Sequence, residues 1–401
     1  MAFAITADDS FNLFNDEQRR LLSVGTPAFG ACEYDFTYGN LLPGSFPAEA
    51  WRKLTADALF SIEGTQTSCY NDNLGDFLLR LNIANHLRKS RGVRCFPEQV
   101  VIQPGTQAAI QNLLQLFNPA KDKVAMEEPG YDGVRKVFEH AGFKLIPCPT
   151  HLDTEAYLDA VNHSGARLAY VTPSHQFPIG AIMPTQSRQQ LLDWARVNDA
   201  FLIEDDYCHE FRYRTRAMPS LQSLDTYHRV VYAGTFSKVL SPALRMSYLI
   251  LPPTLLASWR ERYDGYYSAV PWLNQAVLRR LFEEGLWDKL VRKAYTRNKR
   301  RHEALRDALQ RYLGDKIDII EGGTGLHLLI GVRDGRNQET LIGQAASAGV
   351  RVYGTDRYWI AREHPLGNHL LLGFSAIAEE RIAPGIATLA QAWFPEGSGC
   401  T

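Results

Sequence analysis

The amino-acid sequence predicts an α/β protein, with a mainly parallel seven-stranded sheet in a large domain and a smaller α+β domain after it. Three observations support this fold class. Seven short β-rich runs lie between residues 99 and 251, and amphipathic helical stretches separate several of them. The runs are apolar almost throughout, as expected for parallel strands that helices cover on both faces. After Pro252 the pattern changes to long helices followed by further strand-like runs.

The elements are expected in the following order. Residues 1–50 mix short apolar runs with glycine and proline, which predicts an irregular N-terminal arm. Helical spacing extends from Trp51 to Arg91 and is broken by a loop at 65–75. The seven strands are predicted at Gln99–Gln103, Lys123–Met126, Phe143–Ile146, Arg167–Thr172, Phe201–Ile203, Arg229–Ala233 and Met246–Leu251, with helices at Gln107–Phe117, Val134–Ala141 and Gln186–Asn198.

The large domain is predicted to span residues 51–265 and the small domain residues 266–401. Long helices are expected over 273–312, interrupted at Gly285, and strands at Leu326–Val332, Val350–Val352 and His369–Phe374. The helical segment contains a basic stretch without interleaved aromatic residues, which predicts a solvated helix face rather than a nucleic-acid contact. Its members are Arg297, Lys299, Arg300 and Arg301.

The overall charge excludes several classes of protein. Lys and Arg number 43 against 44 Asp and Glu, a formal net charge of −1, whereas nucleic-acid and anionic-membrane binding require a basic excess. No apolar run approaches the roughly 20 residues that span a bilayer. The N-terminus lacks the positive region of a secretory signal, so a cytoplasmic location is expected.

The cysteines lie far apart, which predicts reduced thiols and no metal site; they are Cys32, Cys69, Cys95, Cys148, Cys208 and Cys400.

Two predicted strand ends carry polar residues at the edge where α/β sheets bind ligands. In the turn Gly105-Thr106-Gln107 a strand gives way to a helix, whose free N–H groups and dipole suit a phosphate. Gly-Thr is also an ordinary helix entry. In Glu204-Asp205-Asp206-Tyr207 an acidic pair ends an apolar strand, and a carboxylate there requires a cation, solvent or a helix N-terminus to cap.

A third strand end carries a lysine. Thr235 and Ser237 precede Lys238, and Arg245 follows seven residues later. A lysine beside a buried strand end can lose its proton through desolvation and act as a nucleophile. The alternative is a lysine that extends from a loop into solvent.

Together these motifs resemble those of fold-type I pyridoxal phosphate enzymes of the class I and II aminotransferase group, and in particular the aminotransferase-like domain of MocR-type regulators. The resemblance extends from about Asp35 to Phe374. MocR regulators carry a winged-helix domain before this region, and here only a short arm is expected there. The matching motifs are Tyr70-Asn-Asp-x-x-Gly75, Arg91-Gly-Val-Arg94, Gly105-Thr106-Gln107, Glu128-Pro-Gly-Tyr131, Thr172-Pro-Ser-His175-Gln-Phe-Pro-x-Gly180, Glu204-Asp-Asp-Tyr207, Gly234-Thr-Phe-Ser-Lys238, Gly325-Leu-His327 and Leu372-Gly-Phe374.

The resemblance implies pyridoxal 5′-phosphate as cofactor and a role for each matching residue. Lys238 corresponds to the lysine that forms the Schiff base, and Asp205 to the partner of the pyridine nitrogen. Tyr207 corresponds to a donor to the cofactor 3-oxygen, and Tyr131 to the ring that stacks on the cofactor. The phosphate would be held by Gly105, Thr106, Gln107, Thr235, Ser237 and Arg245, with Tyr70 reaching the phosphate of the neighbouring subunit. A homodimer with shared active sites is therefore implied.

Two departures from the family pattern bear on function. The asparagine that commonly precedes Pro-x-Gly is absent, and His175 or Gln176 is the candidate to contact the 3-oxygen instead. The usual Leu-Arg-Leu-Gly-Phe motif, whose arginine pairs with the substrate carboxylate, has Leu371 at the arginine position. Either the substrate is an amine or ω-amino compound, or Arg357 or Arg362 holds its carboxylate. A misaligned motif is the remaining explanation.

The predicted function is a PLP-dependent aminotransferase with a small-molecule amine or amino-acid substrate and a non-standard substrate pose. A PLP-dependent lyase, decarboxylase or oxidative deaminase is an alternative, because loss of the carboxylate clamp changes which bond at Cα is aligned for cleavage. A non-catalytic effector protein that binds the cofactor and an amine is an alternative of another class. No nucleic acid and no membrane partner is expected.

Overall fold

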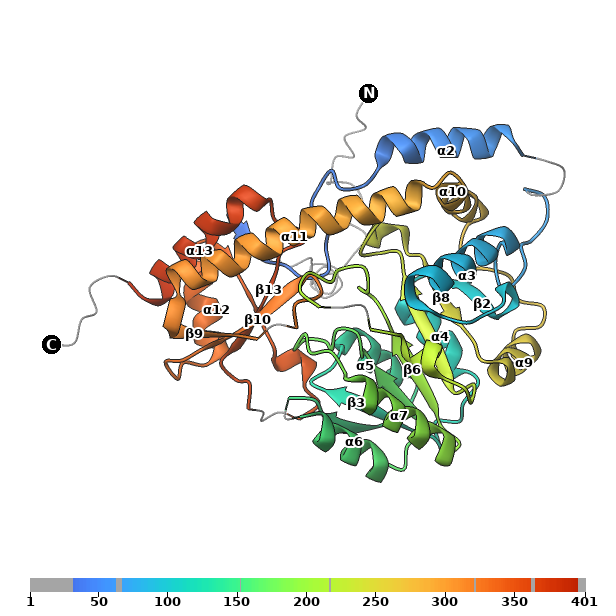
Figure 1. The fold of residues 1–401 in the computed structure, drawn as a ribbon, viewed down its shortest axis with the longest axis horizontal. Coiled ribbons are helices and arrows are strands. Elements are labelled where there is room, and N and C mark those ends of the chain that lie inside the picture. The colour runs from blue at the N-terminus through green and yellow to red at the C-terminus, as the bar shows by residue number, and fades with distance from the viewer. Residues whose placement is uncertain are drawn as a thin grey trace, which may run out of the picture.

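A computed structural model describes residues 32–62, 67–151, 153–215, 218–320, 322–361 and 365–395. Its larger sheet has seven strands in the order β2-β8-β7-β6-β5-β3-β4 (Figure 1). Pairing from β4 to β7 is parallel, and β8 is antiparallel to β7 and β2. The predicted mainly parallel seven-stranded sheet is confirmed. Its strands are β2 (Val100–Gln103), β3 (Lys123–Glu128), β4 (Lys144–Pro149), β5 (Leu168–Val171), β6 (Phe201–Asp205), β7 (Val230–Thr235) and β8 (Ser247–Ile250).

Helices cover both faces of this sheet. Side chains alternate along each strand, so Leu168 and Tyr170 enter one apolar cluster and Ala169 and Val171 the other. Helices α4 (Thr106–Leu114), α5 (Asp132–His140) and α9 (Pro253–Arg262) pack on the first cluster, and α6 (Thr154–His163), α7 (Thr185–Val197) and α8 (Leu221–Leu224) on the second. The three predicted helices match α4, α5 and α7 closely, whereas α6, α8 and α9 had no sequence prediction.

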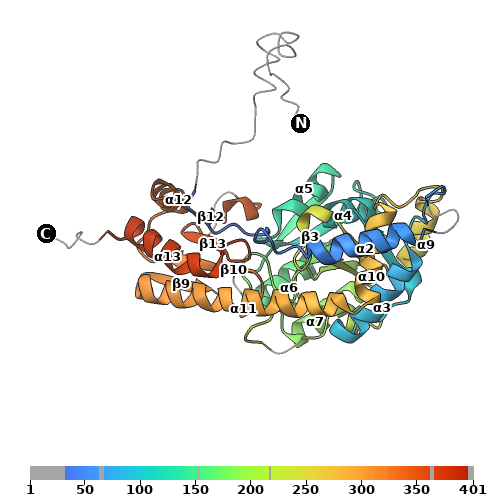
Figure 2. The same ribbon diagram turned by 90° about the horizontal axis from the view of Figure 1, so that it is seen from above.

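The C-terminal part lies beside the large sheet, and the long helix α11 (Leu286–Tyr312) extends between them (Figures 1 and 2). Helix α10 (Trp272–Glu283) precedes it, and Gly285 between them adopts a positive φ of 65°. A second, antiparallel sheet has the order β12-β13-β10-β9. Its strands are β9 (Ile317–Ile320), β10 (His327–Val332), β12 (Tyr353–Gly354) and β13 (His369–Gly373), and helices α12 (Gln338–Ser347) and α13 (Glu379–Trp393) accompany it.

The described part of the predicted arm is attached to the C-terminal part. Strand β1 (Tyr34–Asp35) pairs in parallel with β11 (Val350–Arg351), and Phe36 is fully buried. Helices α2 (Ala48–Phe60) and α3 (Phe77–Arg91) follow, and both contact α10. The pairing of β1 shows that the arm is not irregular throughout; residues 1–31 lie outside the described residues. The proposed domain boundaries remain predictions.

One expectation about the surface was wrong. Arg301 in the basic stretch of α11 is 3% exposed, because its guanidinium donates to the Ser375 carbonyl at 2.9 Å. The face is therefore only partly solvated.

The five cysteines within the described residues are free; Cys400 lies outside them. Within the same residues, no helix is long and apolar enough to span a membrane, and no three His, Cys, Asp or Glu side chains gather as metal ligands would.

Candidate active site

A cavity of about 460 Å³ opens at the carboxyl ends of β5, β6 and β7. Parallel strands with helices on both faces leave their C-terminal loops free to form such a site. Thr172 follows β5, Asp205 ends β6, and Thr235 ends β7. The predicted site residues that line the cavity are Thr106, Gln107, Tyr131, Asp205, Tyr207, Thr235, Ser237, Lys238 and Arg245.

Asp205 presents one free carboxylate oxygen to this cavity. Its Oδ2 accepts a hydrogen bond of 2.5 Å from the hydroxyl of Tyr170, whereas Oδ1 is buried and has no partner among the described residues. A buried polar atom without a partner is rare and requires an explanation. Burial raises the pKa of Asp205 to about 6, against the hydrogen bond from Tyr170, which lowers it. A cationic N–H donor bound to Oδ1 would supply the missing hydrogen bond and offset the cost of burying the charge.

Lys238 lies in the same cavity, three residues beyond the end of β7. Its Nζ is 3.4 Å from the carbonyl oxygen of Gly39 and 4.8 Å from the ring centre of Tyr38. Burial lowers the pKa of the ammonium, although Cys208 and Asp205 oppose this effect. A lysine with a lowered pKa is more often in the neutral, nucleophilic form.

The polar end of the cavity is built from a helix N-terminus and a loop. Helix α4 begins at Thr106, so its first backbone N–H groups are free to bind an anion. The Thr235 hydroxyl donates to the Ser237 hydroxyl at 2.9 Å, and Arg245 completes the group. A guanidinium, hydroxyls and a helix N-terminus together match the requirements of a phosphate.

Gly105 is required where this loop meets Arg245. Its φ is +93°, and a Cβ there would lie 2.2 Å from Nη2 of Arg245. We expect Gly105→Ala to weaken pyridoxal phosphate binding by about tenfold or more and to cost about 1–3 kcal/mol of stability. The control is Gly142→Ala, with a φ of +82° and its nearest neighbour at 3.8 Å. It should lose similar stability but keep its affinity in an equilibrium titration, and equal affinity losses would contradict the prediction.

Aromatic side chains form part of the cavity wall. Tyr131 and Tyr207 line the cavity, together with Tyr38, Phe177 and Tyr358. The ring of Phe177 lies between Tyr38 and Tyr358, at centroid distances of 5.1 and 4.8 Å. Such a wall suits a flat ring, because aromatic faces stack or meet edge to face.

Besides Gly105, which lies against Arg245, three predicted residues do not line the cavity. The His175 ring pairs with the Thr324 hydroxyl at 2.7 Å, and its main-chain carbonyl accepts from Tyr207 at 3.1 Å. Gln176 donates to the carbonyls of Pro129 and Phe177. Tyr70 is 80% exposed and stacks on Tyr267 at 4.2 Å, away from this chain's cavity. Neither candidate for the missing asparagine therefore lines the site, and Tyr207 does.

The arginine position of the family motif is apolar in space as well as in sequence. Leu371 is fully buried in a cluster with Phe177, Leu329 and Tyr358, on strand β13 opposite Tyr353. Leucine offers no hydrogen bond to a carboxylate, and a carboxylate buried there would be strongly disfavoured.

A different arginine reaches the cavity. Arg357 lines it, and its guanidinium binds the Asp132 carboxylate, with Nε at 2.9 Å and Nη2 at 2.5 Å from Oδ2. The Arg357 side chain is 63% exposed, whereas Asp132 is 8% exposed. Arg362, the other candidate, lies outside the described residues.

The sequence analysis missed part of the site. Tyr38, Gly39 and Asn40 come from the segment predicted as an arm, and no local signal marks them. Tyr170 was hidden in an apolar run, although a tyrosine in a strand buried on both faces requires a partner for its hydroxyl. That requirement is the signal that could have found it.

The family description "Aminotransferase class I and II" matches residues 30–351 of the chain. The chain belongs to this family. It is 38% identical over 359 residues to an uncharacterized HTH-type transcriptional regulator of Bacillus subtilis, YdeL, which covers 90% of this chain and 76% of that protein. It is 34% identical to the probable rhizopine catabolism regulatory protein MocR of Rhizobium meliloti, over 88% and 71%. The MocR-type resemblance is thus confirmed.

Among solved structures, LysN of Thermus thermophilus, an α-aminoadipate aminotransferase complexed with N-(5′-phosphopyridoxyl)-L-leucine, superposes with a TM-score of 0.78. The identity is 26%, and the match covers 94% of each chain. This family's cofactor is pyridoxal 5′-phosphate. The cavity fits it: the unpartnered Oδ1 of Asp205 matches a pyridinium N–H, Lys238 an aldehyde, and the group at Arg245 a phosphate.

Proposed function

We propose that this chain binds pyridoxal phosphate through Lys238 and catalyses a reaction at a substrate amino group, with transamination as the first candidate. The observation that carries the proposal is the cavity itself. A desolvated lysine, a buried carboxylate with one unpartnered oxygen and an anion-binding helix N-terminus line a single space. Each of these three groups matches a different part of the cofactor, and together they specify it more closely than any one of them alone.

When bound, the cofactor supplies an electron-withdrawing ring that accepts the electrons of a bond broken at the substrate Cα. Asp205 keeps a proton at the ring nitrogen, because its Oδ1 is an anion without another partner. Lys238, once released, moves a proton at its Nζ between substrate atoms. Burial lowers the pKa of Lys238, which favours the neutral amine. Tyr38, whose ring centre lies 4.8 Å from Nζ, shields that atom from water.

Single-turnover mass spectrometry tests this function. Purified protein is loaded with pyridoxal phosphate, mixed with a panel of amines and α-amino acids, and the released product and cofactor are weighed. Pyridoxamine phosphate with a carbonyl product indicates transamination. Unchanged cofactor with ammonia or carbon dioxide indicates a lyase, deaminase or decarboxylase. Failure of borohydride to fix a phosphopyridoxyl group on Lys238 would overturn the proposal.

The substrate is held without the usual arginine. Leu371 and its neighbours offer an apolar surface, so an anionic group must lie elsewhere. Arg357 is the candidate to bind it, because it lines the cavity and its exposed guanidinium can exchange Asp132 for a substrate carboxylate. A substrate with its anionic group distant from the amine, or an amine without one, fits this arrangement.

We expect Arg357→Met to raise KM for carboxylate-bearing substrates by about ten- to a hundredfold, the loss of one charged hydrogen-bonding partner. Simple amines should keep their KM. Arg333→Met is the matched control, since Arg333 is likewise exposed and bound to one carboxylate, Asp318, but does not line the cavity. An equal effect on both substrate classes would show that Arg357 does not select the anionic group.

A second candidate is a non-catalytic effector domain, favoured by the 34–38% identity to curated transcriptional regulators. Such a protein would bind the cofactor and an amine but release no product. The same single-turnover experiment separates the two, because a substrate-dependent spectral change without any released product favours the effector.

A homodimer is also proposed. Tyr70 and Tyr267 are stacked on each other and exposed at the surface, with Tyr266 close by in the chain and also exposed. An exposed aromatic pair of this kind suits contact with a second copy. Tyr70 would then contribute its hydroxyl to the phosphate of the other subunit.

A further inference from the structure

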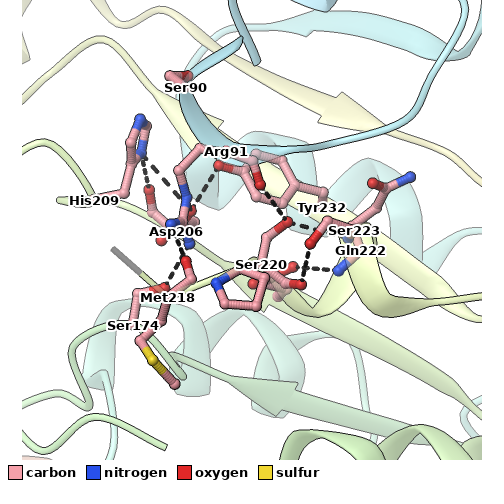
Figure 3. A network of polar contacts seen from close by, with 12 residues as sticks. Ser90, Arg91, Ser174, Asp206, His209, Met218, Ser220, Gln222, Ser223 and Tyr232 are labelled. Carbon is pink, nitrogen blue, oxygen red and sulfur yellow. Dashed lines mark hydrogen bonds and ion pairs between the residues drawn. The ribbon is translucent and has the colours of Figure 1, made fainter. Parts of the chain in front are cut away.

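The motif Arg91-Gly-Val-Arg94 has no part in the function proposed so far, yet Arg91 is among the most enclosed charges in the molecule. Its side chain is 2% exposed at the C-terminus of α3, where Gly92 ends the helix with a φ of 70°. Nε donates to Oδ2 of Asp206 at 2.6 Å, Nη2 to the hydroxyl of Ser174 at 2.9 Å, and Nη1 to the carbonyl of Met218 at 2.7 Å (Figure 3).

Asp206 is the centre of this network. Its side chain is fully buried, and Oδ2 also accepts from the hydroxyl of Tyr232 at 2.8 Å. His209 faces the same oxygen from 3.8 Å (Figure 3). Oδ1 has no partner within the described residues. The ion pair with Arg91 keeps the pKa of Asp206 below its usual range despite burial.

The network lies directly behind the active site. Asp206 follows Asp205 at the end of β6, and alternation along the strand sends the two carboxylates in opposite directions. Asp205 lines the cavity, whereas Asp206 and Arg91 do not. A second carboxylate therefore stands one residue from the group that faces the ring nitrogen. Two neighbouring anions raise each other's affinity for positive charge.

We propose that Asp206, held ionised by Arg91, is a positioning residue that sets the basicity of Asp205 toward the cofactor ring nitrogen. This inference rests on the proposed function. The negative field of Asp206 adds to that of Asp205 and favours a proton on the ring nitrogen. Arg91 reduces the field only in part, because it bonds Oδ2 of Asp206, whereas Oδ1 has no partner within the described residues.

Several other groups act on the two carboxylates. Tyr170 of β5 donates to Asp205, Lys238 beyond β7 attracts it, and Glu127 of β3 is a third buried acid nearby. Glu204 and Glu210 lie in the field of Arg91 and Asp206. Of all these charges, Asp206 raises the pKa of Asp205, and Lys238 and the Tyr170 hydrogen bond lower it. Removing the charge of Asp206 should therefore lower the pKa of Asp205.

The test measures the equilibrium affinity for pyridoxal phosphate as a function of pH, without turnover. In wild type, affinity should fall on the acid side as Asp205 of the free protein takes up its proton. In Asp206→Asn, this acid limb should move to lower pH by about one unit, a tenfold change in the ionisation constant. The double variant Arg91→Met/Asp206→Asn lacks both charges, and its limb should move in the same direction by a smaller amount.

Arg80→Met is the matched control. Arg80 lies on the same helix as Arg91, is 4% exposed and donates to the backbone carbonyls of Gly75 and Pro97. The charges that act on it, such as Asp72 and Glu98, lie outside the Arg91–Asp206 network, so its loss should lower the thermal stability of the apoprotein and leave the acid limb in place. If Asp206→Asn does not fold, because it strands a buried arginine, the double variant decides alone.

An acid limb that stays at the wild-type pH in the folded Asp206 variants, or that moves upward, would overturn this inference while leaving the proposed function intact. A wild-type protein that binds no pyridoxal phosphate would overturn both. A change in melting temperature without a shift of the limb would show that the network only stabilises the fold.

Discussion

Lys238→Ala is expected to abolish turnover, with a loss of at least about 10³-fold, and to leave no cofactor that borohydride can fix to the chain. The lysine is the cavity group whose Nζ, desolvated between Tyr38 and the Gly39 carbonyl, can both attack an aldehyde and carry a proton. Alanine removes both capacities but leaves the phosphate-binding group at Arg245 untouched. The variant should therefore still bind pyridoxal phosphate, reversibly and more weakly.

Lys136→Ala is the comparison for this experiment. Lys136 also borders the cavity but stands on the exposed face of α5. After borohydride reduction and proteolysis, mass spectrometry should find the phosphopyridoxyl label on the Lys238 peptide in wild type and in Lys136→Ala. A label that survives in Lys238→Ala would assign the attachment to another lysine and refute the site as described.

The strand ends could be predicted from the sequence because their signals are local. Asp205 and Lys238 each follow an apolar run within a few residues, and parallel strands bring such ends to one edge. The Gly105 turn is likewise a short-range pattern, in which a strand, a glycine and a helix start follow one another. The seven-stranded sheet was predicted for the same reason, since burial on both faces leaves an uninterrupted apolar run for each strand.

The rest of the site depends on long-range packing, which periodicity does not encode. Tyr38 lies some two hundred residues from Lys238 in sequence, and it reaches the cavity because β1 pairs with β11. Arg357 enters from the segment between β12 and β13, where its place is fixed by Asp132 on α5. His175 matched a family motif, yet its ring turns to Thr324. Motif position specifies the backbone but not the direction of the side chain.

Asp205→Asn is expected to reduce turnover by about 10²–10³-fold, comparable to the loss of a preorganised charge in other active sites. Asparagine keeps the size of the side chain and the contact with Tyr170 but removes the anion. The free Oδ1 would then meet a ring nitrogen without holding its proton there. Asp205→Glu, which keeps the charge, should recover part of the rate, and a neutral variant as active as wild type would exclude this role.

Asp205→Asn should lose turnover but gain stability, which separates the role of Asp205 in catalysis from its effect on folding. Burial raises the pKa of Asp205 from 3.8 to about 6, so the folded apoprotein binds more protons than the unfolded chain between these values. The free energy of unfolding of wild type therefore falls as pH rises through this window. Asparagine carries no charge to bury, so Asp205→Asn should gain stability over wild type as pH rises from about 4 to about 6. Urea unfolding of the two apoproteins at both pH values measures the difference, and a catalytic loss with equal or higher stability would mark Asp205 as selected for its chemistry.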